Sequence, residues 1–163
     1  MKNIVLIGMM GAGKTTIGKL LAEKLTRELV DMDAVIVQRE GREISEIFAV
    51  DGENYFRELE HRLAGELAQR EGLIIACGGG LPTREPTIQL LAKTGIVVFL
   101  CRDPGETYDS VPMEGRPLGQ DGRAAFLARF AAREPIYRRW ADVVVTDFSS
   151  PAATVGKILE ALA

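Results

Sequence analysis

Short, uninterrupted apolar runs alternate along the chain with longer stretches in which apolar residues recur three and four positions apart. A short continuous apolar run is typical of a strand buried on both faces of a parallel sheet. The three-and-four spacing is typical of a helix with one apolar face. We therefore expect five strands, at residues 3–7, 29–30 (ending at Asp31), 73–77, 96–100 and 143–145.

The stretches between these runs predict helices, and glycines mark the ends of several of them. Residues 103–122 carry proline, glycine and charge, which predicts a short helix followed by an exposed loop. Pro135 has no amide hydrogen to donate, so we expect it to bend or break a helix over residues 123–140. The other expected helices cover residues 14–25, 34–40, 44–50, 54–70, 85–93 and 151–162.

This alternation of strands and helices predicts an α/β protein. Parallel strands need crossover connections, which place helices on both faces of the sheet. The length of 163 residues suits one domain with a single sheet. In such a sheet, ligands bind beyond the carboxyl ends of the strands, so the residues that follow each strand are the candidates for chemistry.

Composition narrows the possible partners. The net charge is −3, which argues against a nucleic-acid partner. No apolar run approaches the roughly 18 residues of a membrane span, so we expect no membrane association. The two cysteines, Cys77 and Cys101, predict buried thiols in a reducing, cytoplasmic setting. With His61 as the only histidine, structural zinc is not expected.

A phosphate-binding motif follows the first predicted strand. Residues 8–15 read GMMGAGKT, which is the pattern G-x-x-x-x-G-K-[ST] between a strand and a helix. Such glycines let the backbone amides point at an anion, and the helix dipole adds positive potential. Lys14 can reach the terminal phosphates of a nucleotide, and the Thr15 hydroxyl can ligate Mg²⁺. The alternative is a chance glycine-rich turn.

Two carboxylates follow the second strand. Alternation along the chain would place Asp31 and Asp33 on one side, near the expected phosphates. One could hold water on Mg²⁺, and the other could orient a substrate hydroxyl and accept its proton. The alternative is that an aspartate simply caps the following helix, a position that aspartate favours.

Further candidates lie on later elements. Arg57 and Arg133, on two expected helices, would bind a carboxylate if they converged on one pocket; Glu60, one helical turn from Arg57, could hold it in place. Residues 78–80, three glycines after the third strand, would allow close approach of a ligand to the backbone. Arg116 could fold over the phosphates from its loop. The alternatives are surface arginines and a plain loop.

In this order the motifs resemble those of the shikimate kinase family. The matching features are the phosphate loop, Asp31-Met32-Asp33, Gly52-Glu53 with Phe56-Arg57, the triple glycine, Arg116-Pro117-Leu118, and Arg133 with Pro135-Ile136-Tyr137. The resemblance runs across almost the whole chain. It implies a three-layer α/β/α P-loop NTPase fold with strand order 2-3-1-4-5. It also implies ATP-dependent phosphorylation of shikimate by a monomer, with a substrate-binding segment over about residues 32–60 and a lid over about residues 109–122.

The resemblance also implies individual roles. The catalytic residues would be Lys14, Asp33 and Arg116, and the metal residues, for Mg²⁺, would be Thr15 and Asp31. The shikimate site would comprise Asp33, Arg57, Gly78, Gly79, Gly80 and Arg133. The ATP site would comprise Gly11, Ala12, Gly13, Lys14, Thr15, Thr16 and Arg116.

The chain also departs from the family pattern. Many members carry an arginine several residues before Arg-Pro-Leu, where this chain has Tyr108-Asp109-Ser110; Tyr108 could stack on adenine instead. Cys77 replaces a serine often found before the triple glycine, and Gly119 replaces an apolar residue. Two alternatives stay open: a kinase of the same fold with another acceptor, such as gluconate or a nucleoside monophosphate, and a nucleotide-binding protein without turnover.

Overall fold

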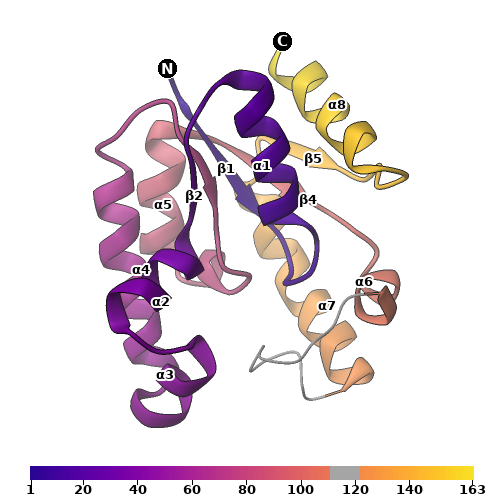
Figure 1. Ribbon diagram of the computed structural model, residues 1–163. Helices are drawn as coiled ribbons and strands as arrows, with labels where there is room; N and C mark the ends of the chain where they lie inside the picture. The colour runs from indigo at the N-terminus through magenta and orange to yellow at the C-terminus, as the bar shows by residue number, and fades with distance from the viewer. Residues whose placement is uncertain (111–121) are drawn as a thin grey trace.

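The computed structural model describes residues 1–110 and 122–163. In this part of the chain a five-stranded sheet has the order β2-β3-β1-β4-β5, with all neighbouring strands parallel (Figure 1). Both the α/β class and the strand order expected from the sequence are confirmed. The strands are β1 (Asn3–Ile7), β2 (Leu29–Asp31), β3 (Ile74–Ala76), β4 (Gly95–Leu100) and β5 (Val143–Val145).

Helices connect the strands, and the first six lie where the sequence predicts them to within a few residues. They are α1 (Lys14–Leu25), α2 (Met32–Glu40), α3 (Ile44–Asp51), α4 (Glu53–Leu67), α5 (Glu85–Thr94) and α6 (Pro104–Ser110). A short 3₁₀ helix, η1 (Leu81–Thr83), precedes α5, and the chain closes with α7 (Arg123–Trp140) and α8 (Pro151–Leu162).

The sheet separates two cores, and the side chains of β1 show how. Ile4 and Leu6 belong to an apolar cluster that includes residues of α1 and α8 on one face. Val5 and Ile7 belong to the cluster on the other face, which includes residues of α4, α5 and α7. All four side chains are at most 1% exposed, and full burial of each contributes about 1.5–3 kcal/mol. This packing on both faces holds the carboxyl ends of the strands rigid.

The expectation that Pro135 interrupts its helix was wrong. The helix α7 runs from Arg123 to Trp140 with Pro135 inside it. Proline costs one backbone hydrogen bond, but buried side chains on both sides of it, Phe130 and Tyr137, pack in the same core. Tertiary packing therefore keeps the two halves of the helix in register.

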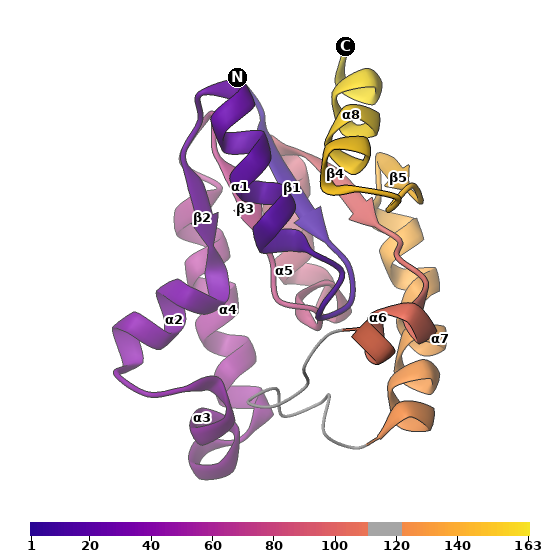
Figure 2. The ribbon, with the colours of Figure 1, turned by 45° about the vertical axis from the view of Figure 1, so that its right-hand side comes forward.

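The carboxyl ends of the strands lie at one end of the molecule. Figure 2 shows α2 and α3 on one side of this end and α6 and α7 on the other, with the loop after β1 between them. The residues singled out in the sequence come from these elements and from the loops beside them. Among the described residues, no helix combines the length and the apolar character that a bilayer span requires.

Candidate active site

The loop between β1 and α1 has the backbone of a phosphate loop. Gly13, immediately before α1, has φ of 101°, a left-handed value that glycine adopts without strain. Gly8 has φ of 149°, and a Cβ there would lie 2.8 Å from the carbonyl oxygen of Leu100, so β4 approaches too closely for any side chain. The Lys14 ammonium crosses the loop and donates to the carbonyl oxygens of Gly8 (2.7 Å) and Met9 (2.8 Å).

Thr15 and Asp31 meet at the mouth of this loop. The Thr15 hydroxyl donates to Asp31 Oδ2 at 2.8 Å, and Asp31 Oδ1 accepts from the amide of Ala34 at 3.2 Å. Asp31 therefore caps α2, which was one of the two interpretations of this residue, and it also faces the phosphate loop. A hydroxyl and a carboxylate are the hard oxygen ligands that Mg²⁺ uses together with nucleotide phosphates, so this pair fits that ion.

Asp33 reaches the site by a different route from the expected one. The chain turns helical at Met32, so Asp33 lies in the first turn of α2 and not on an extended strand end. It nevertheless lines the same cavity as Asp31. The expected convergence of the two carboxylates is thus present, although strand alternation does not produce it.

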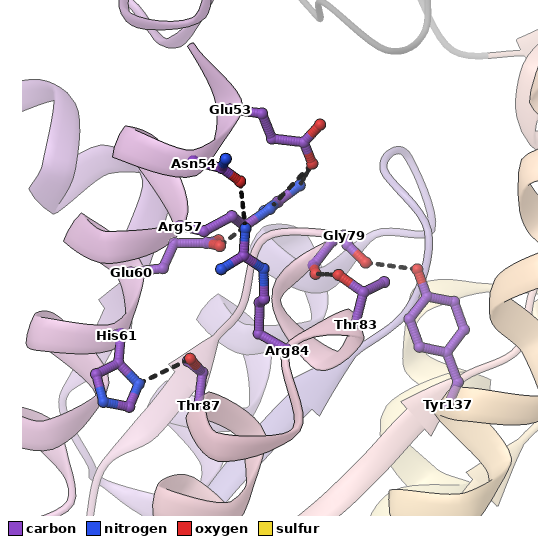
Figure 3. A network of polar contacts seen from close by, with 11 residues as sticks. Glu53, Asn54, Arg57, Glu60, His61, Gly79, Thr83, Arg84, Thr87 and Tyr137 are labelled. Atoms are coloured by element: carbon purple, nitrogen blue, oxygen red, sulfur yellow. Dashed lines mark hydrogen bonds and ion pairs between the residues drawn. The ribbon is translucent and has the colours of Figure 1, made fainter. Parts of the chain in front are cut away.

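Arg57 is held by two glutamates of its own helix (Figure 3). Its Nη1 donates to Glu60 Oε1 at 2.7 Å, and its Nε and Nη2 donate to Glu53 Oε2 at 3.2 and 2.9 Å. Glu60 is 1% exposed, and burial raises its pKa to about 7 against the opposing effect of Arg57. Burial lowers the pKa of Arg57, but the two glutamates outweigh it, so its pKa is raised.

Arg133, on α7, lines the same cavity as Arg57. It is buried, and its Nη1 has no hydrogen-bond partner in the part of the chain that the structure describes. Burial lowers the pKa of Arg133, a hydrogen bond with Tyr137 opposes that effect, and Arg57 adds like-charge repulsion. Two guanidinium groups so placed, one of them with an unsatisfied donor, favour an anionic ligand between them.

The triple glycine after β3 lets these charged groups approach the backbone. A Cβ on Gly80 would lie 2.1 Å from Arg57 Nη2, and one on Gly79 would lie 3.2 Å from the backbone nitrogen of Met10 and 3.5 Å, an ordinary contact distance, from Arg133 Nη1. A Cβ on Gly78 would lie 2.8 Å from Asp33 Oδ1 and 2.9 Å from Glu60 Oε2. Gly78 and Gly80 are therefore needed for space, and a side chain at Gly79 would be tight against the backbone of Met10.

Tyr137 joins α7 to the glycine segment, and sequence reasoning gave it no role. Its side chain is fully buried, and its hydroxyl donates to the Gly79 carbonyl oxygen at 2.6 Å (Figure 3). The Arg133 guanidinium interacts with the same side chain, which opposes the effect of burial on the pKa of Arg133. Tyr137 thus links Arg133 with the backbone that faces Arg57. Two sequence signals pointed to it: its position, one helical turn after Arg133, and its place in the family feature Pro135-Ile136-Tyr137.

One cavity of about 570 Å³ unites these groups. The phosphate-loop residues Lys14, Thr15 and Thr16 line it together with Asp33 and both buried arginines. The apolar side chains of Phe48 and Phe56, whose ring centroids are 5.3 Å apart, form part of its wall. Arg102, which follows β4, also lines it, although no motif in the sequence pointed to this residue. Arg116 lies outside the described residues.

Cys77 forms part of the cavity floor. It is 2% exposed and lies at the end of β3, immediately before the triple glycine. Burial raises the pKa of its thiol well above the usual range. The residue is therefore a neutral thiol at neutral pH, a poor ligand for a hard cation such as Mg²⁺.

A strand–glycine loop–helix phosphate site with a charged anion subsite beside it defines a P-loop phosphotransferase. The family model described as "Shikimate kinase" matches residues 10–163, and the chain belongs to the shikimate kinase family.

Known proteins similar to this chain agree with that assignment. A shikimate kinase of Symbiobacterium thermophilum is 40% identical, with 98% of this chain and 95% of the relative covered. Another, of Chromohalobacter salexigens, is 42% identical over 96% of this chain and 89% of the relative. The solved shikimate kinase of Acinetobacter baumannii in complex with shikimate has a TM-score of 0.92 and 36% identity, covering 99% of this chain and 93% of that one.

Proposed function

We propose that this chain transfers the γ-phosphoryl group of ATP to a ring hydroxyl of shikimate, forming shikimate 3-phosphate in the route to chorismate and the aromatic amino acids. The observation that carries the proposal is the position of Arg57 and Arg133. Both line the cavity of the phosphate loop, and both approach the triple glycine. Shikimate is a carboxylate with several hydroxyls, so its acid group fits the arginines while a hydroxyl faces the nucleotide.

The nucleotide would occupy the phosphate loop. The loop residues Gly11, Ala12 and Gly13, together with Thr16, would bind phosphates through the backbone, and Lys14 would reach the terminal ones. When bound, Mg²⁺ would neutralise phosphate charge, held by Thr15 with Asp31 nearby. Arg116 keeps its predicted role as the lid arginine over the transferring group.

The acceptor would occupy the β2–β3 side of the cavity. Arg57 and Arg133 would bind the carboxylate through charge-assisted hydrogen bonds, and the glycine segment would approach the ring closely. Asp33 would accept the proton of the attacking hydroxyl. The hydroxyl oxygen would bond to the γ-phosphorus while the bond between that phosphorus and ADP breaks. Most of the rate acceleration would come from positioning and charge stabilisation, since phosphoryl transfer needs little covalent help from the protein.

The wider arrangement follows from the same proposal. The single domain would have residues 32–60 as its substrate-binding segment, since α2, α3 and the start of α4 supply Asp33, Phe48 and Arg57. Residues 109–122 would form the lid. The monomeric state and the cytoplasmic location stay predictions.

A coupled ADP-release assay tests the function. ADP should appear only when ATP, Mg²⁺ and shikimate are all present, and gluconate or a nucleoside monophosphate in place of shikimate should give background rates. Shikimate-independent release would contradict the proposal, and faster release with gluconate would assign another acceptor. ATP binding with no release under any condition would indicate a nucleotide-binding protein without turnover.

A further inference from the structure

The nucleoside end of the nucleotide must leave the phosphate loop on the β4 side. The acceptor residues Asp33 and Arg57, with the triple glycine, lie on the side of β2 and β3. In-line transfer places the acceptor and the departing ADP on opposite sides of the γ-phosphorus. Since β4 is the neighbour of β1 opposite to β3, the purine lies beyond the end of β4.

Arg102 lies at that place, two residues past the end of β4. Its Nη1 donates to the carbonyl oxygen of Gly11 at 3.2 Å, and its Nη2 donates to Ser110 Oγ at 3.0 Å. The side chain is half-buried and lines the cavity. It thus bridges the phosphate loop and the end of α6, which lie next to each other at this edge of the site (Figures 1 and 2).

These two contacts leave the guanidinium available to a ligand. Arginine has five N–H donors in a planar group, and the two hydrogen bonds that the described residues provide use two of them. The Gly11 carbonyl oxygen and the Ser110 hydroxyl each occupy one donor, and the other donors remain for a nucleotide. The flat face of a guanidinium stacks well on an aromatic ring such as a purine.

Two neighbouring side chains that could contact the purine already have other partners. The ring of Tyr108, which the sequence suggested for adenine, packs on Phe126 with ring centroids 5.5 Å apart. Tyr108 is absent from the described lining of the cavity. Arg123, the first residue of α7, is paired with Asp109 at 3.0 Å on the exposed side.

We propose that Arg102 is a further nucleotide-binding residue, which stacks its guanidinium on the purine of ATP and orients the nucleoside outside the phosphate loop. The proposal rests on the nucleotide half of the proposed function and not on the identity of the acceptor. Arg102 thereby contributes to the affinity and base preference of the enzyme, while Lys14 and the loop amides bind the phosphates.

Calorimetric titration of the full chain with ADP and with tripolyphosphate tests this role. Arg102→Ala should raise the Kd of ADP about tenfold and leave the Kd of tripolyphosphate, which has no base, unchanged. Arg102→Lys keeps the charge without the planar group and should recover less than half of the lost affinity on a logarithmic scale. Arg123→Ala is the control. Arg123 is an exposed arginine that pairs with Asp109 of α6, and this variant should bind ADP as the parent chain does.

Three results would overturn the proposal: an unchanged Kd for ADP in Arg102→Ala, equal losses for ADP and tripolyphosphate, or full recovery in Arg102→Lys. An unchanged thermal melting curve of Arg102→Ala would show that the variant is folded. Because these titrations need no acceptor, a failure of shikimate phosphorylation would leave their outcome intact, and the two ideas can fail separately.

Discussion

Arg57 and Glu60 form an ion pair that is almost fully buried, with exposures of 4% and 1%. The cost of removing two charges from water offsets much of their Coulomb attraction, so an apolar pair of the same volume would often be as stable. The second oxygen of Glu60 has no hydrogen-bond partner among the described residues. This arrangement adds little to stability, and it holds a guanidinium at a fixed place in the cavity wall.

Removal of Arg133 should weaken the binding of shikimate much more than the binding of ATP. Arg133→Ala would remove the proposed charge-assisted contact to the shikimate carboxylate, worth about 1.5–3 kcal/mol, so the Kd of shikimate should rise about 10- to 150-fold. The affinity for ATP should change little, because Arg133 lies on the acceptor side. Calorimetric titration of each ligand measures both, and similar losses for both would remove Arg133 from the shikimate site.

A single added methyl group at Gly80 should have the same effect on shikimate without removing any charge. The Cβ of Gly80→Ala would lie 2.1 Å from Arg57 Nη2, and Arg57 is held by Glu60 and Glu53, so the guanidinium must move. We expect KM for shikimate to rise at least tenfold, the equivalent of about 1.4 kcal/mol, while KM for ATP stays within about twofold.

The matched control is Gly156→Ala on α8. There a Cβ meets nothing within 4 Å, and alanine favours the helix over glycine. Its kinetics should equal those of the parent chain, with equal or higher thermal stability. If Gly80→Ala behaved in the same way, Arg57 would not be positioned by the glycine segment.

The buried carboxyl of Glu60 should give the protein a pH-dependent stability. Burial raises its pKa from 4.5 to about 7, so between these values the folded chain binds more protons than the unfolded chain. The free energy of unfolding therefore falls as pH rises through this window, and this contribution is lost above about pH 7.

Glu60→Gln tests whether Glu60 causes this pH-dependent stability, because glutamine does not titrate. The variant loses the ion pair and should be less stable overall. The stability difference between parent and variant should shrink as the pH rises from 5 to 8, as measured by urea denaturation at each pH. A difference that is constant over this range would mean that Glu60 titrates normally.

At the scale of elements, the hydrophobic pattern predicts most of the fold, because the inner strands β1, β3 and β4 are buried on both faces and the main helices on one. Pro135 shows the limit of such local reasoning. Its effect depends on whether Phe130 and Tyr137 pack in one core, and that contact is formed only in the folded chain. The start of α2 at Met32 depends in the same way on the Asp31 cap.

The candidate site was predictable where it followed a local motif and unpredictable where it depended on contacts between distant elements. Residues 8–15 have a recognisable spacing, and the triple glycine suggested close approach. Tyr137 and Gly79 are 58 positions apart, and Arg102 and Gly11 are 91 apart. No periodicity in the sequence signals such pairs, so the roles of Tyr137 and Arg102 required the structure.

The Tyr137 hydroxyl should couple α7 to the glycine segment. Tyr137→Phe keeps the ring packed against Phe99, at a centroid distance of 5.0 Å, and leaves the carbonyl oxygen of Gly79 without its donor, at a cost of about 1–3 kcal/mol. Because Arg133 also loses its partner, KM for shikimate should rise several-fold more than KM for ATP. Steady-state kinetics with each substrate varied in turn measure this split.

Tyr55→Phe is the control for this change. Its hydroxyl donates to Glu40 at 3.0 Å on the exposed side of the substrate-binding segment, where one lost hydrogen bond should change stability by at most about 0.5 kcal/mol. Both KM values should stay at the parent level. An equal rise in the two KM values of Tyr137→Phe would indicate general loosening of the fold and not positioning of Arg133.

At the scale of the whole molecule, one rigid sheet carries two subsites with different chemistry. The β1–β4 side presents the phosphate loop and Arg102, and the β2–β3 side presents the buried ion pair and the triple glycine. Because both cores pack on the same strands, each ligand that binds the folded chain stabilises the molecule as a whole.

Shikimate should therefore raise the melting temperature even without nucleotide. At one hundred times its measured Kd it adds about 2.7 kcal/mol to the free energy of unfolding, which for a domain of this size raises Tm by about 5–10 °C. Gluconate at the same concentration has a carboxylate but no ring to fill the wall formed by Phe48 and Phe56, and it should shift Tm by less than about 1 °C. Differential scanning calorimetry with each acid measures both shifts. Equal shifts would mean that the arginines select any small carboxylate and that the aromatic wall contributes nothing to the choice of acceptor.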